Sequence, residues 1–96
     1  MKKIFKWIYK PEGNCPVQSE GYFLGYYFYF RARHELATIE FYNKKEDFCR
    51  EEPIYYFILK ETSQHRAGWM SKRESMYLIF KGCLMLVYKF FESKIK

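Results

Sequence analysis

Apolar and polar residues alternate most regularly between Tyr22 and Tyr42, and this alternation predicts a β-hairpin. Successive side chains of a strand point to opposite faces of the sheet. One face of the first arm carries the apolar residues Leu24, Tyr26, Phe28, Phe30 and Ala32. The matching face of the second arm carries Ala37, Ile39 and Phe41. We therefore expect these two sets to pair and to form the sheet side of a hydrophobic core.

The opposite face of the hairpin combines aromatic and charged residues: Tyr27, Tyr29, Arg31, Arg33, Thr38, Glu40 and Tyr42. Tyr and Arg often dominate protein interfaces. They also suit single-stranded nucleic acid, where bases stack on rings and Arg contacts phosphates. The predicted binding residues are Tyr27, Tyr29, Arg31, Arg33, Glu40 and Tyr42. The alternative is a structural face, which the helix or loops cover and in which Arg31 and Arg33 pair with Glu35 and Glu40.

Residues 1–21 are interpreted as a strand followed by a loop. Lys2 to Lys10 alternates aromatic with basic residues, which favours a short edge strand. A basic amphipathic helix is the alternative, although a helix this short is marginal in isolation. Pro11 to Gly21 is predicted to be a loop with a turn at Gly13-Asn14.

Residues 43–53 form a charged connection, either a loop or one helical turn, which Pro53 closes. Residues 54–60 begin with the apolar run IYYFIL, whose length suits a strand. Because that run is continuously apolar, we expect both of its faces to be covered and the strand to lie at the centre of the sheet. Residues 61–70 are predicted to be a polar loop.

Residues 71–93 are predicted to form a helix. Ser71 and Glu74 have the spacing of a capping box, in which each side chain accepts a hydrogen bond from the other residue's backbone N–H. One apolar stripe is assigned to the sheet: Met76, Ile79, Phe80, Cys83, Val87, Phe90 and Phe91. The remaining apolar residues form a candidate self-interface of Leu78, Met85, Leu86 and Tyr88. Lys81 and Lys89 interrupt the apolar sequence, so we do not expect a membrane span.

Together these elements predict an α+β fold in one domain, residues 1–96. The fold is a small antiparallel β-meander of three or four strands packed on one long C-terminal helix. A chain of 96 residues supports one hydrophobic core but not two.

Composition agrees with a folded chain, because 49% of the residues are hydrophobic and 23% are aromatic. The net charge of +6 favours acidic partners, although the basic residues are spread along the chain. Three scattered cysteines do not form a disulfide framework, and the first ten residues lack the features of a signal peptide. We therefore predict a cytoplasmic protein.

Candidate chemistry is sparse. The only histidines are His34 and His65, and they share no short spacing with each other or with Cys15, Cys49 and Cys83. Zinc sites usually use closely spaced pairs of such ligands. No glycine-rich phosphate loop or nucleophile motif occurs. The sequence therefore predicts no catalytic residue, no metal site and no cofactor.

We expect a non-catalytic binding protein that acts by occupying the surface of a macromolecular partner, most simply another protein. A small inhibitor, adaptor or immunity-type protein of a microbe or phage would fit. One alternative is a nucleic-acid-binding module that uses the Tyr/Arg face. Another is a structural homodimer formed through the C-terminal helix.

Overall fold

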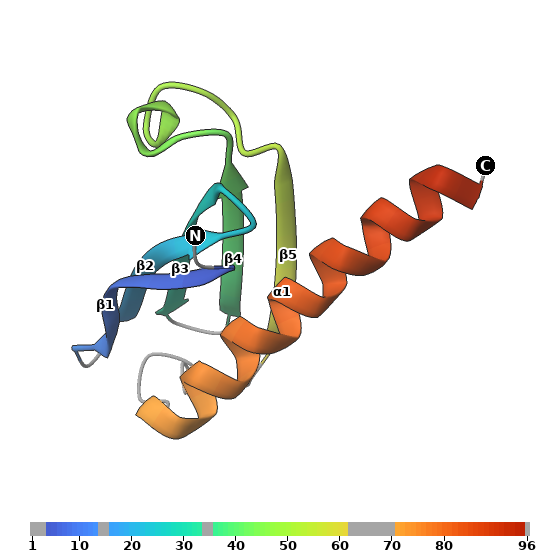
Figure 1. Ribbon diagram of the computed structural model, residues 1–96. Coiled ribbons are helices and arrows are strands. Elements are labelled where there is room, and N and C mark those ends of the chain that lie inside the picture. The colour runs from blue at the N-terminus through green and yellow to red at the C-terminus, as the bar shows by residue number, and fades with distance from the viewer. Residues whose placement is uncertain (1–3, 14–15, 34–35, 62–70, 96) are drawn as a thin grey trace.

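The computed structural model describes residues 4–13, 16–33, 36–61 and 71–95. Five strands in this part of the chain form one antiparallel sheet in the order β1-β2-β3-β4-β5, and one long helix packs against it (Figure 1). The elements in chain order are β1 (Phe5–Glu12), β2 (Val17–Phe23), β3 (Tyr26–Arg33), β4 (Leu36–Tyr42), the 3-10 helix η1 (Lys45–Asp47), β5 (Tyr55–Glu61) and α1 (Lys72–Ile95). The α+β class, the antiparallel sheet and the C-terminal helix are confirmed, but the predicted number of three or four strands is wrong.

The additional strand is β2, which occupies much of the segment predicted to be a loop. It joins β3 through Leu24 and Gly25, whose φ angles are 52° and 85°. Two positive φ angles are typical of the two-residue type I′ turn of tight hairpins, which Gly favours and Leu does not. The buried positions of β2 include the small residues Ser19 and Gly21, so the strand lacks a strong apolar pattern.

Strand β1 lies at one edge of the sheet, in agreement with the preferred interpretation of the N-terminal segment. Phe5 and Trp7 pack against the core, while Lys6 and Lys10 are exposed. Pro11 belongs to the strand, which an edge position permits because proline cannot donate a ladder hydrogen bond. Of the predicted turn at Gly13-Asn14, Asn14 lies outside the described residues.

The hairpin of β3 and β4 has the predicted alternation. Three cross-strand pairs, Phe28 with Phe41, Phe30 with Ile39 and Ala32 with Ala37, are in register, and all six side chains are fully buried. Val17 of β2 and Phe57 and Leu59 of β5 extend this inner face. The core therefore lies between the inner face of the sheet and α1.

The helix face that packs on the sheet overlaps the predicted face only in part, since Ile79, Cys83 and Phe90 of the predicted stripe lie in or against the core. Leu78, Ile79, Cys83 and Leu86 are buried in the core, whereas Phe80 and Phe91 are exposed. Apolar residues occur nearly all round this helix, so their spacing alone does not identify the inward face. The assignment of Leu78 and Leu86 to the outside, and of Phe91 to the sheet, was therefore wrong. Phe80 lies at the margin, because its ring still contacts Phe5 and Trp7 of β1. No helix in the described ranges is both long enough and apolar enough to cross a bilayer.

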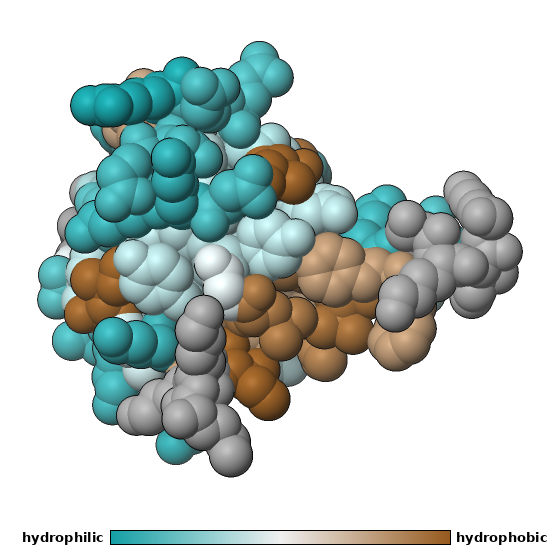
Figure 2. Space-filling view, turned by 45° about the horizontal axis from the view of Figure 1, so that its top comes forward, coloured by the Kyte–Doolittle hydropathy of each residue, from teal (hydrophilic) through white to brown (hydrophobic). Residues whose placement is uncertain are grey.

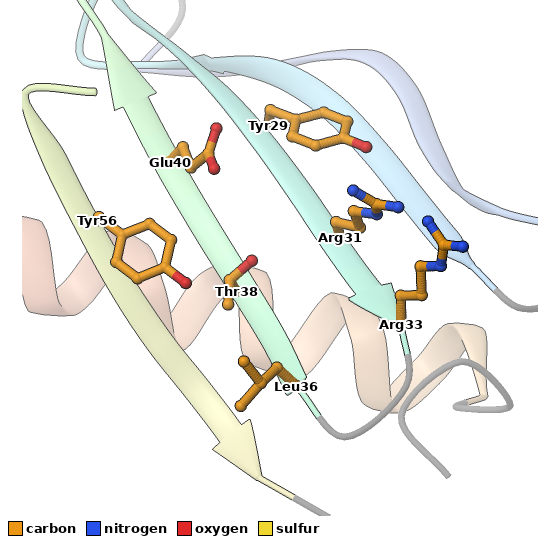
Figure 3. A pocket seen from close by; sticks show the side chains of 7 residues that line it. All are labelled: Tyr29, Arg31, Arg33, Leu36, Thr38, Glu40 and Tyr56. Atoms are coloured by element: carbon orange, nitrogen blue, oxygen red, sulfur yellow. The ribbon is translucent and has the colours of Figure 1, made fainter. Parts of the chain in front are cut away.

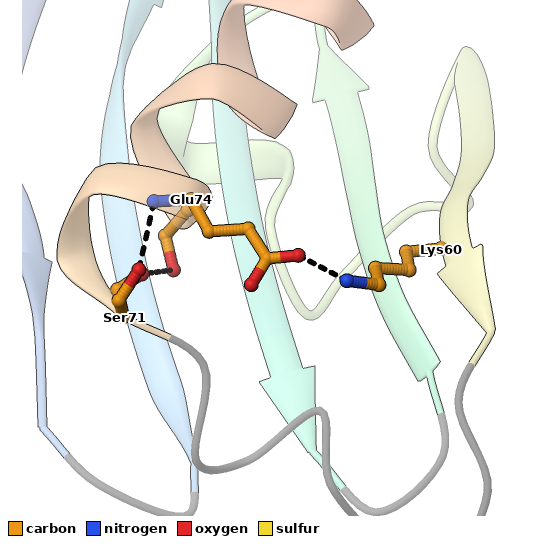
Figure 4. A network of polar contacts seen from close by, with 4 residues as sticks. Lys60, Ser71 and Glu74 are labelled. Carbon is orange, nitrogen blue, oxygen red and sulfur yellow. Dashed lines mark hydrogen bonds and ion pairs between the residues drawn. The ribbon is translucent and has the colours of Figure 1, made fainter.

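The start of α1 contains one half of the predicted capping box (Figure 4). The backbone N–H of Glu74 donates to the Ser71 hydroxyl over 3.1 Å. The Glu74 carboxylate does not bond back to the Ser71 N–H; it accepts from the ammonium of Lys60 on β5. This ion pair connects the first turn of the helix to the edge of the sheet.

Strand β5 lies at the second edge of the sheet, so the predicted central position is wrong. Its inner side chains, Phe57 and Leu59, are buried, and its outer side chains, Tyr56 and Ile58, are about half exposed. The run is continuously apolar because its outer face carries exposed apolar residues, not because both faces are covered.

Candidate functional site

A shallow hollow of about 350 Å³ lies on the outer face of the sheet, opposite the helix (Figure 3). Its lining comes from three neighbouring strands: Tyr29, Arg31 and Arg33 of β3, Leu36, Thr38 and Glu40 of β4, and Tyr56 of β5. Alternation brings these side chains to one face, because Tyr29 pairs with Glu40, Arg31 with Thr38 and Arg33 with Leu36. The hollow therefore combines two cations with apolar and aromatic walls.

Arg31 and Arg33 are the main charged groups of the hollow. Within the described ranges, neither guanidinium forms an ion pair. The Nε atom of Arg31 is buried and has no hydrogen-bond partner there. Glu40 lines the same hollow, but its carboxylate accepts a hydrogen bond of 2.6 Å from the Tyr42 hydroxyl. The proposed pairing with Glu40 is therefore not formed, and Glu35 lies outside the described residues.

The tyrosines next to the hollow pack against the β4–β5 connection and stabilise the outer face of the sheet. Phe48, from the β4–β5 connection, contacts the rings of Tyr27, Tyr29 and Tyr42 at centroid distances of 5.8, 4.7 and 5.7 Å. Tyr27 and Tyr42 are buried beneath this connection. They share a face with the arginines, as predicted, but their rings are not available to a partner.

The hydroxyl groups of these tyrosines are also occupied. Tyr27 donates to Glu20, and Tyr29 donates to Gln18 over 3.1 Å. Burial, followed by the hydrogen bonds to Glu20 and Glu40, raises the pKa values of Tyr27 and Tyr42 above the ordinary value. Burial also raises the pKa of Tyr29. These phenols remain protonated at neutral pH and act as fixed hydrogen-bond donors.

Two aromatic residues of this face, besides Leu36, were missing from the sequence prediction. Tyr56 was overlooked because β5 was expected to be covered on both sides, although the alternation of residues 55–59 places it outside. Phe48 is an apolar residue within the charged connection. Such an isolated apolar residue in a polar connection is a usable signal, because it often packs back onto the neighbouring sheet.

The candidate self-interface on the helix is divided by the fold. Leu78 and Leu86 are buried in the core and Met85 packs against it, so these three cannot form a surface seam. Tyr88 alone among the four is exposed. The exposed apolar side of the helix combines Tyr88 with residues that were not assigned to the self-interface.

The structure describes two of the three cysteines, Cys49 and Cys83. Cys83 packs in the core, and burial raises its pKa to about 12, so the thiol is protonated at neutral pH. Cys49 is exposed in the β4–β5 connection. Cys15, His34 and His65 lie outside the described residues. Within those ranges, no three His, Cys, Asp or Glu side chains are grouped so that they could hold a metal ion.

The chain was compared with protein-family models, with curated proteins and with solved structures. None of the three comparisons finds a match. The function is therefore inferred from the chemistry of the outer face and of the helix surface.

Proposed function

We propose that this protein is a non-catalytic binding protein whose outer sheet face takes an acidic segment of a partner protein. The observation that carries the proposal is the pair Arg31 and Arg33, side by side on β3 without an ion pair from any described residue. Guanidinium groups bind carboxylates through two parallel hydrogen bonds. Leu36 and Tyr56 offer apolar contact beside them. The preferred ligand is therefore acidic and carries an apolar side chain.

The spacing of the two arginines suggests the pattern of the ligand. Residues two apart on a strand are separated by roughly 7 Å. An extended acidic segment with carboxylates two residues apart has the same repeat. We therefore propose a segment in which two Asp or Glu residues flank one residue, with an apolar residue close by.

The position of β3 supports selective binding. It is the central strand of the sheet, paired with β2 on one side and β4 on the other. A strand that is fixed on both sides has little backbone entropy left to lose on binding. The cytoplasmic location predicted from the cysteines forms part of the same proposal, with an inhibitor or adaptor as the class of protein.

Nucleic-acid binding is less well supported by the same face. Base stacking needs exposed rings. Tyr27 and Tyr42 are buried, and Phe48 covers Tyr29, which leaves Tyr56 as the exposed ring of the hollow. Phosphates could still pair with Arg31 and Arg33, so the experiment includes a single-stranded oligonucleotide.

The test is selection of a displayed random-peptide library on the parent protein, followed by titration of the enriched peptides. We expect carboxylates two residues apart with an apolar neighbour. The variant Arg31→Ala/Arg33→Ala should weaken binding of these peptides at least tenfold. The matched control is Lys6→Ala/Lys10→Ala, which removes the same charge from exposed positions of β1 and should retain most of the affinity.

Two results would contradict the proposal. Equal losses in both double variants would mean that net charge, not the hollow, attracts the peptides. If the oligonucleotide bound more tightly than the enriched peptides, and its affinity fell steeply with salt concentration, the nucleic-acid alternative would be favoured instead. Thermal unfolding of each variant shows that the comparison is made between folded proteins.

A further inference from the structure

The outward side of α1 carries an apolar stripe that the described elements cover only at one margin, where the ring of Phe80 contacts Phe5 and Trp7 of β1. It consists of Tyr77, Phe80, Leu84, Tyr88 and Phe91, which are 66%, 44%, 70%, 67% and 61% exposed. With about 3.6 residues per turn, these positions fall on one side of the helix, opposite the buried Leu78, Ile79 and Leu86. Figure 2 shows hydrophobic surface along the region where the helix runs. We call these five residues the outer helix stripe.

The outer helix stripe is symmetric about its central residue. Phe80 and Tyr88 lie equally far from Leu84 along the chain, one on each side, and so do Tyr77 and Phe91. An isologous dimer requires a patch that is complementary to itself under a two-fold rotation. An aromatic–leucine–aromatic stripe with symmetric spacing meets this requirement, whereas an unrelated partner or a lipid surface does not require it.

We propose that a second copy of this chain covers the outer helix stripe, with the two helices antiparallel and Leu84 on the two-fold axis. In this arrangement Phe80 packs against Tyr88 of the second copy, and Tyr77 packs against Phe91 of the second copy. Both pairs join a Tyr ring to a Phe ring, so each tyrosine can keep its hydroxyl in water at the edge of the contact. Such aromatic pairs are favourable beyond the area they bury.

The available area is sufficient for a modest dimer. An aromatic side chain offers about 200 Å², so the exposed fractions of the five residues amount to about 600 Å² per copy. Two copies would bury about 1,200 Å², the lower end of the range for stable interfaces. The C-terminal part of α1 also projects beyond β5 (Figure 1). We therefore expect dimerisation in the micromolar range.

This inference is independent of the proposed function. The helix packs on the inner face of the sheet, and the hollow with Arg31 and Arg33 lies on the outer face. Dimerisation through the helix therefore leaves the hollow of each copy open. Loss of the dimer should not change the affinity for an acidic peptide, and loss of Arg31 and Arg33 should not change the dimer.

The test uses the two-fold axis. Leu84→Glu and Leu84→Lys each place two like charges opposite one another in a dimer, so each variant alone should raise the dissociation constant at least tenfold. An equimolar mixture of the two variants brings unlike charges together and should restore the dimer mass. The readout is sedimentation velocity from micromolar to submillimolar protein. Leu84 is exposed, so both variants should unfold at nearly the parent temperature.

The matched control is Leu24→Glu, which makes the same change at an exposed leucine in the β2–β3 turn and should leave the dimer intact. A parent protein that is monomeric throughout the concentration range would overturn the proposal. A mixture of the two Leu84 variants that stays monomeric would also overturn it. A monomeric parent that binds vesicles of anionic phospholipid, and loses this binding in Leu84→Glu, would assign the stripe to a membrane surface instead.

Discussion

The ring of Phe48 lies against the ring of Tyr29, with centroids 4.7 Å apart and planes inclined by 33°. This contact attaches the β4–β5 connection, which includes η1, to the outer face of the sheet. It divides that face into a covered part, with Tyr27 and Tyr42 beneath Phe48, and an open part around Arg31 and Arg33. The connection therefore determines how much of the outer face a partner can reach.

Phe48→Ala should uncover the buried tyrosines and destabilise the fold. The variant loses ring contacts with Tyr27, Tyr29 and Tyr42, but Phe48 is only partly buried, so the cost should fall below that of a core phenylalanine. We expect the free energy of unfolding to decrease by about 2 kcal/mol. Urea unfolding measures this change, and near-ultraviolet circular dichroism should show weaker tyrosine bands. Phe48→Leu keeps apolar contact, so its free energy of unfolding should lie between those of the parent protein and Phe48→Ala. An unchanged free energy in Phe48→Ala would mean that the connection does not cover the sheet in solution.

The buried tyrosines predict a loss of stability in alkaline solution. The pKa values of Tyr9, Tyr27 and Tyr42 are raised, first by burial and then by hydrogen bonds to Glu20 or Glu40. Above the ordinary tyrosine pKa of about 10, the unfolded chain releases protons that the folded chain retains. Stability should therefore be constant below that pH and should fall above it, by about 1.4 kcal/mol per pH unit for each such tyrosine.

Urea unfolding at a series of pH values on both sides of the tyrosine pKa tests this expectation. Above the tyrosine pKa, the slope of the free energy of unfolding against pH counts the protons released on unfolding. Tyr27→Phe should reduce this number by one, and Tyr27→Phe/Tyr42→Phe should reduce it by two. Tyrosinate absorbance should rise together with unfolding. If the absorbance of these residues rose while the protein remained folded, burial and the carboxylate hydrogen bonds would not control their ionisation.

At Gly82, helix propensity and packing should have opposite effects on a change to alanine. Alanine is preferred over glycine in a helix by about 1 kcal/mol. However, a Cβ atom at position 82 would lie 2.8 Å from Cγ2 of Ile39, which is fully buried. We expect Gly82→Ala to lower the free energy of unfolding by about 1–3 kcal/mol in spite of its better helix propensity.

A double-mutant cycle with Ile39→Ala separates the two effects, because alanine lacks the obstructing Cγ2 atom. In the Ile39→Ala background, Gly82→Ala should become neutral or stabilising, so the two changes should not be additive. Additive costs, measured by urea unfolding, would show that the helix does not approach β4 this closely.

A substitution in the turn between β2 and β3 should increase the stability of the protein. Leu24 adopts a φ of 52°, in the region where Asn is much better tolerated than Leu. Asn-Gly is the favoured pair for a type I′ turn. Leu24→Asn should raise the free energy of unfolding by about 0.5–1 kcal/mol. Thermal unfolding checks this, with Gly25→Ala as the opposite change, since Gly25 has a φ of 85° and alanine should be destabilising there.

The central hairpin was predictable because its two arms alternate strongly between large apolar and polar residues. The pairing of Phe28 with Phe41 and of Phe30 with Ile39 follows from that pattern. Strand β2 was missed because Ser19 and Gly21 occupy inward positions and because Leu24-Gly25 does not resemble a common turn. Local pattern identifies a strand only where its inward residues are large and apolar.

The candidate site was predictable in part for the same reason. Tyr29, Arg31, Arg33 and Glu40 were assigned to one face, and they line the hollow together. The cover of Phe48 over Tyr27 and Tyr42 was not predictable. It depends on the path of an irregular connection, whose sequence has no hydrophobic periodicity. The helix faces were misassigned because Leu78, Phe80, Leu84 and Leu86 make every side of α1 apolar. Only packing against Ile39 and Leu59 decides which side is inside.

The neighbour-to-neighbour order of the strands has a consequence for synthesis on the ribosome. Each strand pairs only with strands adjacent to it in the chain, so the sheet can assemble hairpin by hairpin as the polypeptide emerges. The helix that covers its aromatic inner face follows all five strands. At 5–20 residues per second, its 24 residues take roughly 1–5 s to translate. During that interval Phe28, Phe30 and Phe41 have no cover, and the nascent chain is then most dependent on protection by chaperones.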